Sequence, residues 1–190
     1  MTLIKIALVG DGSVGKTSLR ERFLGKEFKT NYMMTVGADF AIHEQKINGK
    51  SVKFQIWDLA GQMRFKEVRP IYYRGTMGAL MVYDVTRPDS FENTPMWIEE
   101  CYSHTGKGSV PMMLLGNKVD LRADLPNCLD PKHGEALAKE MSEITKPKGF
   151  EVKYYETSAK TGENVEDAFV ALGKEILKYI DKLKDSRFSK

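Results

Sequence analysis

Short, almost wholly apolar runs alternate along the chain with longer stretches in which apolar residues recur every three or four positions. The short runs are typical of strands covered on both faces, and the longer stretches are typical of amphipathic helices. We expect strands over 3–9, 78–84, 110–115 and 151–156, and helices over 16–25, 89–101, 131–144 and 165–180. Strands and helices that alternate in this way predict an α/β fold built on one sheet.

One stretch departs from this alternation. Between residues 39 and 57 two strand-like segments flank Asn48 and Gly49, a dipeptide that readily adopts the positive φ angles of a tight hairpin turn. These two strands are therefore expected to pair antiparallel. In the expected helix 165–180 the apolar residues share one face, which we interpret as core packing. They are Val165, Phe169, Leu172, Ile176 and Ile180.

Composition excludes several classes of protein. A length of 190 residues suits one domain, and we expect a monomer. With 42% hydrophobic and 29% charged residues the chain is neither disordered nor fibrous, and a net charge of +3 does not indicate a nucleic-acid partner. The two cysteines, Cys101 and Cys128, are too few for a disulfide framework, so a reducing compartment, the cytoplasm, is expected.

Targeting signals do not change this interpretation. The N-terminus lacks the order of a signal peptide, and no apolar run reaches the roughly 18 residues of a membrane span. Thr2 excludes N-myristoylation, and residues 186–190 contain no cysteine for prenylation. We expect one domain over 1–182 and a short tail over 183–190, without a readable lipid anchor and with any membrane association made through partners.

The loop after the first expected strand, GDGSVGKT over residues 10–17, matches G-x-x-x-x-G-K-[ST] in full. Between a strand and a helix, such a loop turns successive backbone N–H groups and the positive end of the helix dipole toward one point, which makes an anion site. Lys16 can then bridge β- and γ-phosphates, and the Thr17 hydroxyl can coordinate Mg²⁺. The alternative is a glycine-rich turn with an exposed lysine. The nucleotide contacts expected here are Gly12, Ser13, Val14, Gly15, Lys16, Thr17 and Ser18.

Two further polar loops follow expected strands, at the edge where open α/β sheets bind ligands. They are the segment Asn117-Lys118-Val119-Asp120 and the segment Ser158-Ala159-Lys160. The two oxygens of an aspartate match the N1–H and N2–H₂ donors of guanine, and adenine has no such donor pair. A buried carboxylate left unpaired costs about 1 to 3 kcal/mol or more, so Asp120 favours GTP and GDP over adenine nucleotides. The alternative is a polar turn and helix cap.

With these loops in place the chain resembles the Ras superfamily of small GTPases, and within it the Rab branch, over residues 4–180. The further segments that resemble Rab proteins are TVGADF at 35–40, WDLAGQ at 57–62, YYRG at 72–75 and YDVT at 83–86. The resemblance implies a P-loop NTPase fold, the small GTPase G domain. Its sheet has six mostly parallel strands with one antiparallel strand, and helices cover both faces.

The resemblance also implies roles for individual residues. Guanine would be recognised by Asn117 and Asp120 and sandwiched by Lys118 and Phe28, with the Ala159 N–H at its O6 atom. The remaining nucleotide contacts would be Tyr32, Thr35, Gly61, Ser158 and Lys160. Mg²⁺ would be held by Thr17 and Thr35, and by Asp58 through water. Gln62 would orient the attacking water, and Lys16, Thr35 and Gly61 would complete the catalytic set.

The implied function is a GTP-binding switch in Rab-like membrane traffic or signalling. Two segments, 28–37 and 61–75, would change conformation on hydrolysis and contact effectors, an exchange factor and a GTPase-activating protein. Residues 26–35 contain no arginine, so hydrolysis without a partner should be slow. Leu59, Met63 and the tail without cysteine depart from the Rab pattern. The competing hypotheses are a nucleotide-loaded scaffold without useful turnover and an ATP-using P-loop enzyme.

Several other residues have a structural interpretation beside a functional one. Phe40, Trp57 and Tyr72 match the aromatic triad by which Rab-like proteins contact effectors, although core packing is the favoured interpretation. Met33 and Met34 either form an adaptable apolar contact or pack beneath their loop. Histidines 43, 104 and 133 share no ligand spacing, so no zinc site is expected. Lysines 174, 178, 182 and 184 alternate with acids, which favours a solvated helix face over a membrane patch.

Overall fold

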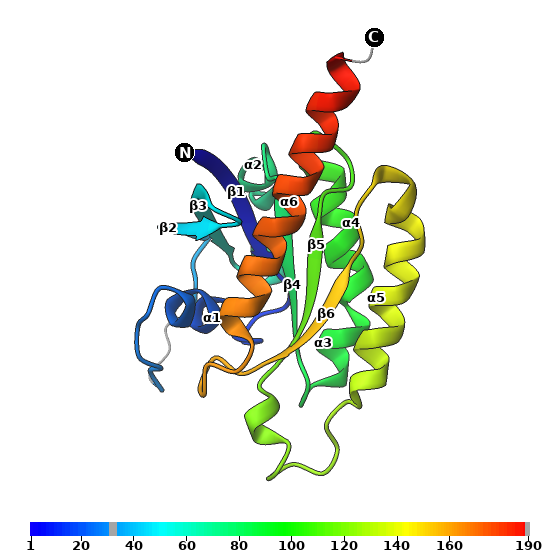
Figure 1. Cartoon of the computed structure of the whole chain (residues 1–190). Coiled ribbons are helices and arrows are strands. Elements are labelled where there is room, and N and C mark those ends of the chain that lie inside the picture. The colour runs from blue at the N-terminus through cyan, green and yellow to red at the C-terminus, as the bar shows by residue number, and fades with distance from the viewer. Residues whose placement is uncertain (31–33, 189–190) are drawn as a thin grey trace.

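A computed structural model describes residues 1–30 and 34–188 of the chain (Figure 1). The strands are β1 (Thr2–Val9), β2 (Ala38–Ile47), β3 (Lys50–Leu59), β4 (Gly78–Asp84), β5 (Met112–Asn117) and β6 (Lys153–Thr157). The α-helices are α1 (Lys16–Phe23), α2 (Arg69–Tyr73), α3 (Pro88–Glu92), α4 (Thr94–His104), α5 (Pro131–Thr145) and α6 (Val165–Phe188). Three short 3₁₀ turns are η1 (Met63–Phe65), η2 (Val119–Leu121) and η3 (Lys146–Lys148).

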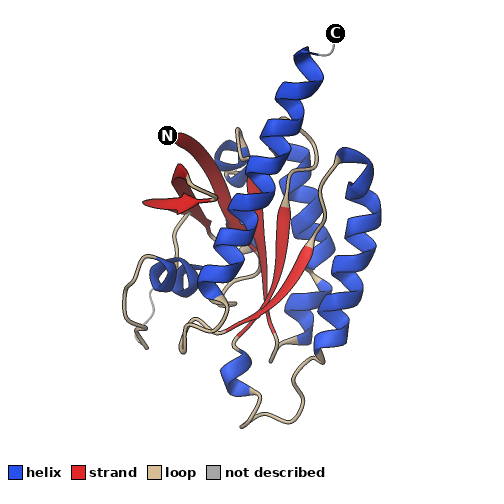
Figure 2. Ribbon diagram, viewed as in Figure 1, coloured by secondary structure: helices blue, strands red, loops and turns tan. Residues whose placement is uncertain are grey.

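The six strands form one sheet in the order β2-β3-β1-β4-β5-β6, with helices on both faces (Figure 2). Every neighbouring pair is parallel except β2 and β3, which pair antiparallel. Asn48 and Gly49 have φ angles of 50° and 74° in the turn between them. The expected α/β fold and the expected antiparallel hairpin are both confirmed.

Side chains along the central strands alternate between two cores, one on each face of the sheet. In β1, Ile6 and Leu8 belong to a core covered by α1 and α6. Ala7 and Val9 belong to the opposite core, covered by α2, α4 and α5. Burial on both faces explains why the central strands are almost continuously apolar.

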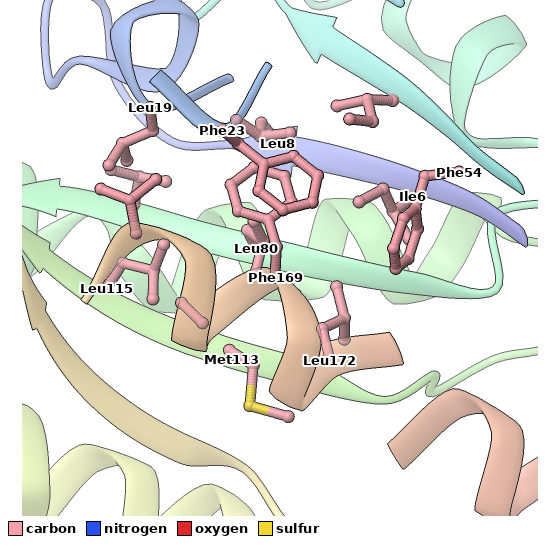
Figure 3. Close-up of a cluster of buried hydrophobic side chains, with 14 of the residues drawn as sticks. Ile6, Leu8, Leu19, Phe23, Phe54, Leu80, Met113, Leu115, Phe169 and Leu172 are labelled. Atoms are coloured by element: carbon pink, nitrogen blue, oxygen red, sulfur yellow. The ribbon is translucent and has the colours of Figure 1, made fainter. Parts of the chain in front are cut away.

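The first core joins α1 to α6 through aromatic packing (Figure 3). The rings of Phe23 and Phe169 stack with centroids 4.0 Å apart. A Cβ on Gly78 would lie 2.5 Å from the Ile176 Cδ1 atom, so α6 packs directly against the backbone of β4. The expected apolar face of 165–180 is confirmed as core packing, with its first four members buried and Ile180 half-buried.

Several element bounds differ from the expectation. The helix expected over 89–101 was wrong as a single element, since it is divided at Asn93 into α3 and α4. Pro95 has no N–H to donate to a preceding helical turn, so it fits only in the first turn of a helix, and α4 begins as a new helix around it. The strand expected from residue 110 begins at Met112, because Pro111 lacks the amide of a central strand. The 3₁₀ turns and α2 are too short for their periodicity to predict.

Two observations concern the C-terminal helix and the membrane. Helix α6 continues to Phe188, past the domain boundary expected at residue 182, and its last turns extend beyond the sheet (Figure 1). That boundary therefore does not coincide with the end of an element and stays a prediction. Among the described residues, no helix combines the length and the apolar character needed to cross a membrane.

The stack of Phe23 on Phe169 generates a test of stability. Replacing fully buried Phe169 by alanine leaves a cavity between α1 and α6, so the free energy of unfolding should fall by about 3 to 5 kcal/mol. Urea unfolding at saturating nucleotide measures this difference. The exposed Lys178→Ala on the same helix is the control and should change it by less than about 0.5 kcal/mol. Equal stability of the two variants would contradict the assigned core.

Candidate functional site

The site lies at the carboxyl edge of the parallel strands, where the loops after β1, β3, β5 and β6 meet. The loop between β1 and α1 has the bent backbone that the glycine pattern predicts, with φ angles of 134° at Gly10, 65° at Ser13 and 99° at Gly15. These positive angles turn the loop around one point in front of the N-terminus of α1. The geometry is that of an anion-binding loop.

Lys16 places a buried cation at the head of this loop. Its Nζ atom donates to the carbonyl oxygens of Gly10 at 2.8 Å and Asp11 at 2.7 Å. Burial lowers the pKa of Lys16 to about 8, although the charges of Asp58 and Asp11 act in the opposite direction. A desolvated cation of this kind attracts an anion more strongly than an exposed lysine does. The alternative interpretation of an exposed lysine in a turn is wrong.

Asn117 joins the phosphate loop to the base loops. Its Nδ2 atom donates to the Val14 carbonyl oxygen at 2.8 Å, and its Oδ1 atom accepts from the Thr157 hydroxyl at 3.2 Å. A Cβ on Gly15 would lie 2.3 Å from the same Nδ2 atom, so only glycine permits this approach. Both ends of the Asn117 amide are thus engaged with the protein, and we assign it a bridging role beside the expected contact with guanine.

A cavity of about 410 Å³ lies between the loops that were expected to bind the base. Asp120 lies in its wall, and its Oδ1 atom accepts from the Ser158 hydroxyl at 2.5 Å, which fixes the carboxylate in one orientation. Ser158 itself is buried behind Asp120. The remaining predicted residues in the wall are Ser13, Gly15, Ser18, Phe28, Asn117, Lys118, Ala159 and Lys160.

Two arginines that the sequence analysis did not single out hold this base cavity in shape. Arg22 of α1 donates to the carbonyl oxygens of Ala159, at 3.1 Å, and Lys160. Arg122, next after η2, pairs with Glu156 of β6 at 2.5 Å. These contacts join residues far apart in the chain, so no local sequence motif predicts them.

Three oxygen-bearing side chains converge beside Lys16. The hydroxyl oxygens of Thr17 and Thr35 lie 3.1 Å apart, and both donate to the Oδ2 atom of Asp58. Asp58 is fully buried, and its Oδ1 atom has no hydrogen-bond partner among the described residues. Burial raises the pKa of this carboxyl, while hydrogen bonds from the hydroxyls and the charge of Lys16 oppose the rise. A hard divalent cation with oxygen ligands, such as Mg²⁺, fits this set of donors.

The expected catalytic residues Gly61 and Gln62 line a hollow in front of the phosphate loop, together with Lys16, Thr17 and Thr35. A Cβ on Gly61 would lie 2.3 to 2.4 Å from backbone atoms of Asp11 and Gly12, so this loop lies directly on the phosphate loop. The Gln62 Nε2 atom donates to the sulfur of Met34 at 2.9 Å. Met34 is 61% exposed and therefore forms a surface contact and does not pack beneath its loop. Tyr32 and Met33 lie outside the described residues.

The aromatic residues of β2, β3 and α2 form a surface cluster. The ring centroids of Phe40 and Trp57 are 5.1 Å apart, and those of Trp57 and Tyr72 are 5.6 Å apart. Trp57 and Tyr72 are half-buried against the second core, but Phe40 is 43% exposed. The favoured interpretation of core packing is therefore wrong for Phe40, which lies on the edge strand β2 and keeps part of its ring in contact with solvent.

Comparison with known proteins agrees with this geometry. The family model described as "Ras family" matches residues 5–178. Ras-related protein RABE1e of Arabidopsis thaliana is 42% identical over 174 residues, which cover 92% of this chain and 75% of the relative. Ras-related protein Rab-13 of Rattus norvegicus is 41% identical over 175 residues, with 92% and 80% covered. Ras-related protein Rab-8 of Diplobatis ommata is 40% identical over 180 residues, with 95% and 80% covered.

The matched region extends from β1 into α6 and contains every loop of the site described above. Identity near 40% over more than nine tenths of the chain leaves no doubt about common descent with the Rab proteins. The chain therefore belongs to the Ras family, in which its Rab relatives fall, and is a small GTPase that binds guanine nucleotides, hydrolyses GTP to GDP and acts as a switch.

Proposed function

We propose that this GTPase serves Rab-like membrane traffic. We also propose that Thr35 and Gly61 hold two switch segments in place only while the γ-phosphate is bound. The observation that supports this most directly is the convergence of Thr17, Thr35 and Asp58 beside Lys16. Thr35 belongs to the segment 28–37, which leads into β2, and Asp58 lies at the end of β3 just before the segment 61–75. A cation bound to the phosphates would therefore be linked to both segments.

Guanine is recognised by Asp120 in this proposal. Ser158 holds one carboxylate oxygen, which orients the group toward the donors of the base. Lys118 has a left-handed φ angle of 70°, and its Nζ atom pairs with Asp84 at 2.6 Å, so its aliphatic stem is held beside the cavity. Phe28, 40% exposed, would cover the opposite face of the base. The Ala159 N–H would meet the guanine O6 atom.

Mg²⁺ would be held by the hydroxyls of Thr17 and Thr35, with Asp58 acting through water. The ion neutralises negative charge on the phosphates when it is bound. The buried Oδ1 atom of Asp58, which has no hydrogen-bond partner in the described part of the chain, supports this assignment, since a cation or its water would satisfy it. Lys16 adds a second positive charge from the same pocket.

Gln62 would orient the attacking water. Its amide offers a carbonyl acceptor and two N–H donors, of which one goes to Met34, so the acceptor and the second donor stay available. Proteins catalyse phosphoryl transfer mainly by positioning the reactants and stabilising charge, so Gln62 need not act as a base. The Gly61 N–H would complete the contacts with the γ-phosphate.

The two segments are coupled through the backbone. The N–H of Ala60 donates to the carbonyl oxygen of Gly37 at 2.9 Å, so the end of one segment is bonded to the residue just before the other. Loss of the γ-phosphate would release both together. Effectors would distinguish the two states at this surface and at the aromatic cluster of Phe40, Trp57 and Tyr72.

Regulatory partners follow from the chemistry of the hollow. No arginine is among the described residues that line it, and Arg87 of the adjacent loop is engaged with the Gly12 carbonyl and Asp89. An activating protein would therefore supply the missing positive charge, and an exchange factor would open the site. We propose a location in the cytoplasm and, through partners, at a membrane surface.

Base recognition can be tested at Asp120. In Asp120→Asn an N–H₂ group replaces one acceptor oxygen and faces the guanine donors, so GTP affinity should fall by about 2 to 3 kcal/mol, or roughly 30- to 150-fold. Titration with a fluorescent GTP analogue measures the loss. Xanthosine triphosphate, which has a carbonyl where guanine has its amino group, should bind the variant better than the parent. Unchanged GTP affinity, or equal affinity of the parent for ATP, would exclude this role.

Catalysis can be tested at Gln62. In Gln62→Leu the water loses its acceptor, so single-turnover hydrolysis of preloaded GTP should slow by about 10-fold or more. GTP affinity should stay within about threefold, because the base and phosphate contacts are unchanged. The neighbouring Met63→Leu, at an exposed position, is the matched control. Equal hydrolysis rates in the two variants would support the nucleotide-loaded scaffold instead.

A further inference from the structure

Arg69, the first residue of α2, is fully buried against α4. It forms a forked ion pair with Glu100, in which Nε lies 2.6 Å from Oε1 and Nη2 lies 2.6 Å from Oε2. The Tyr73 hydroxyl donates to the same carboxylate at 3.0 Å. A bidentate geometry of this kind fixes the plane of the guanidinium group.

The third nitrogen of Arg69 points toward the catalytic loop. Its Nη1 atom donates to the carbonyl oxygen of Gln62 at 3.0 Å and to that of Ala60 at 3.4 Å. These are the two carbonyl groups on either side of Gly61. Glu100 therefore orients Arg69, and Arg69 in turn holds the backbone from which the Gln62 side chain projects.

Helix α4, which carries Glu100, also holds the phosphate loop. The guanidinium group of Arg69 lies over the ring of Trp97, 4.3 Å from the centroid. The Trp97 Nε1 atom donates to Asp11 at 2.6 Å, and Asn93 donates to the second oxygen of that carboxylate at 2.8 Å. Helix α4 with its preceding residue is thus a common frame for the phosphate loop and for the Gly61 loop.

The residues that follow Gln62 are held loosely by comparison. Met63, Arg64, Lys66 and Glu67 are exposed, and η1 buries none of its residues. The Gln62 carbonyl accepts from the Phe65 N–H at 3.1 Å within this turn, and its bond from Arg69 joins the start of the turn to the body of the protein.

Stability alone does not account for a buried pair here. Desolvation of two charges offsets most of their attraction, and apolar pairs of similar volume often replace such ion pairs without loss of stability. A buried ion pair whose guanidinium group also bonds the catalytic loop is suited to positioning that loop.

We propose that Arg69 and Glu100 are positioning residues for GTP hydrolysis, which hold the carbonyls of Ala60 and Gln62 so that the Gln62 amide meets the attacking water. The inference rests on the proposed role of Gln62 and extends it to a buried ion pair on α2 and α4. Neither residue touches the nucleotide in this account, and both act through the backbone around Gly61.

The test replaces the pair by apolar side chains of similar volume, Arg69→Met with Glu100→Leu. The protein should still fold and bind GTP with affinity within about threefold. Its melting temperature should fall, because the buried Tyr73 hydroxyl loses its acceptor and the carbonyls of Ala60 and Gln62 lose their donor. Single-turnover hydrolysis of preloaded GTP should slow by roughly 10- to 100-fold, because the Gln62 backbone loses its hold. Arg69→Lys is the second variant, since one ammonium group cannot reach both the carboxylate and the two carbonyls; it should be slowed similarly.

Introducing the same changes into Gln62→Leu separates positioning from a general structural effect. If Arg69 acts through Gln62, the combined variant should hydrolyse GTP no more slowly than Gln62→Leu alone. The matched control is the exposed pair of Lys50 and Asp181, 2.8 Å apart, replaced as Lys50→Met with Asp181→Leu, which should hydrolyse GTP at the parent rate.

Three results would overturn the proposal. The first is hydrolysis at the parent rate in Arg69 variants that fold. The second is a loss of melting temperature and of GTP affinity while the hydrolysis rate stays at the parent value. The third is a slowing of hydrolysis that adds fully to the slowing caused by Gln62→Leu. Parent-like hydrolysis by Gln62→Leu itself would contradict the role of Gln62. A slow Gln62→Leu beside normal Arg69 variants would reject only the inference about the buried pair.

Discussion

The structure depends on keeping one ammonium group, that of Lys16, charged in a place from which water is largely excluded. Burying a cation is costly unless oxygen atoms replace its hydration shell. The backbone of the phosphate loop provides two carbonyl oxygens, and the carboxylates of Asp11 and Asp58 provide negative charge nearby. The left-handed glycines, the register of β3 and the position of Asp58 at its end all serve this arrangement.

The two faces of the sheet hold the loops around Lys16 in different ways. The face covered by α1 and α6 is an aromatic and aliphatic core, stacked through Phe23 and Phe169, that fixes the start of α1 behind the phosphate loop. The opposite face includes polar groups among its apolar ones, and there Arg69, Glu100 and Trp97 reach the same loops from α2 and α4. One face thus provides rigidity, and the other provides directed hydrogen bonds, which only polar groups in fixed orientations can make.

Switching follows from where these contacts end. The hydroxyl of Thr35 and the backbone of Gly61 are placed by atoms around the phosphate site, whereas the residues just beyond them are exposed. A segment with few buried contacts has little free energy of its own to hold one conformation. In the proposed switch its state would therefore be set by the phosphate end of the site, and the Ala60–Gly37 hydrogen bond would make the two segments respond together.

The sequence by itself determined the α/β fold, the hairpin at Asn48-Gly49, the phosphate loop and the aspartate of the base loop. Each of these is encoded by neighbouring residues whose backbone preferences and periodicity act locally. Only the tertiary structure decided that Asn117 bridges to Val14, 103 positions away, that Arg22 holds Ala159, 137 positions away, and that Arg69 pairs with Glu100, 31 positions away. Such partners are chosen by how helices and strands pack in three dimensions, and a side chain that bonds across the sheet leaves no periodic trace in its own segment.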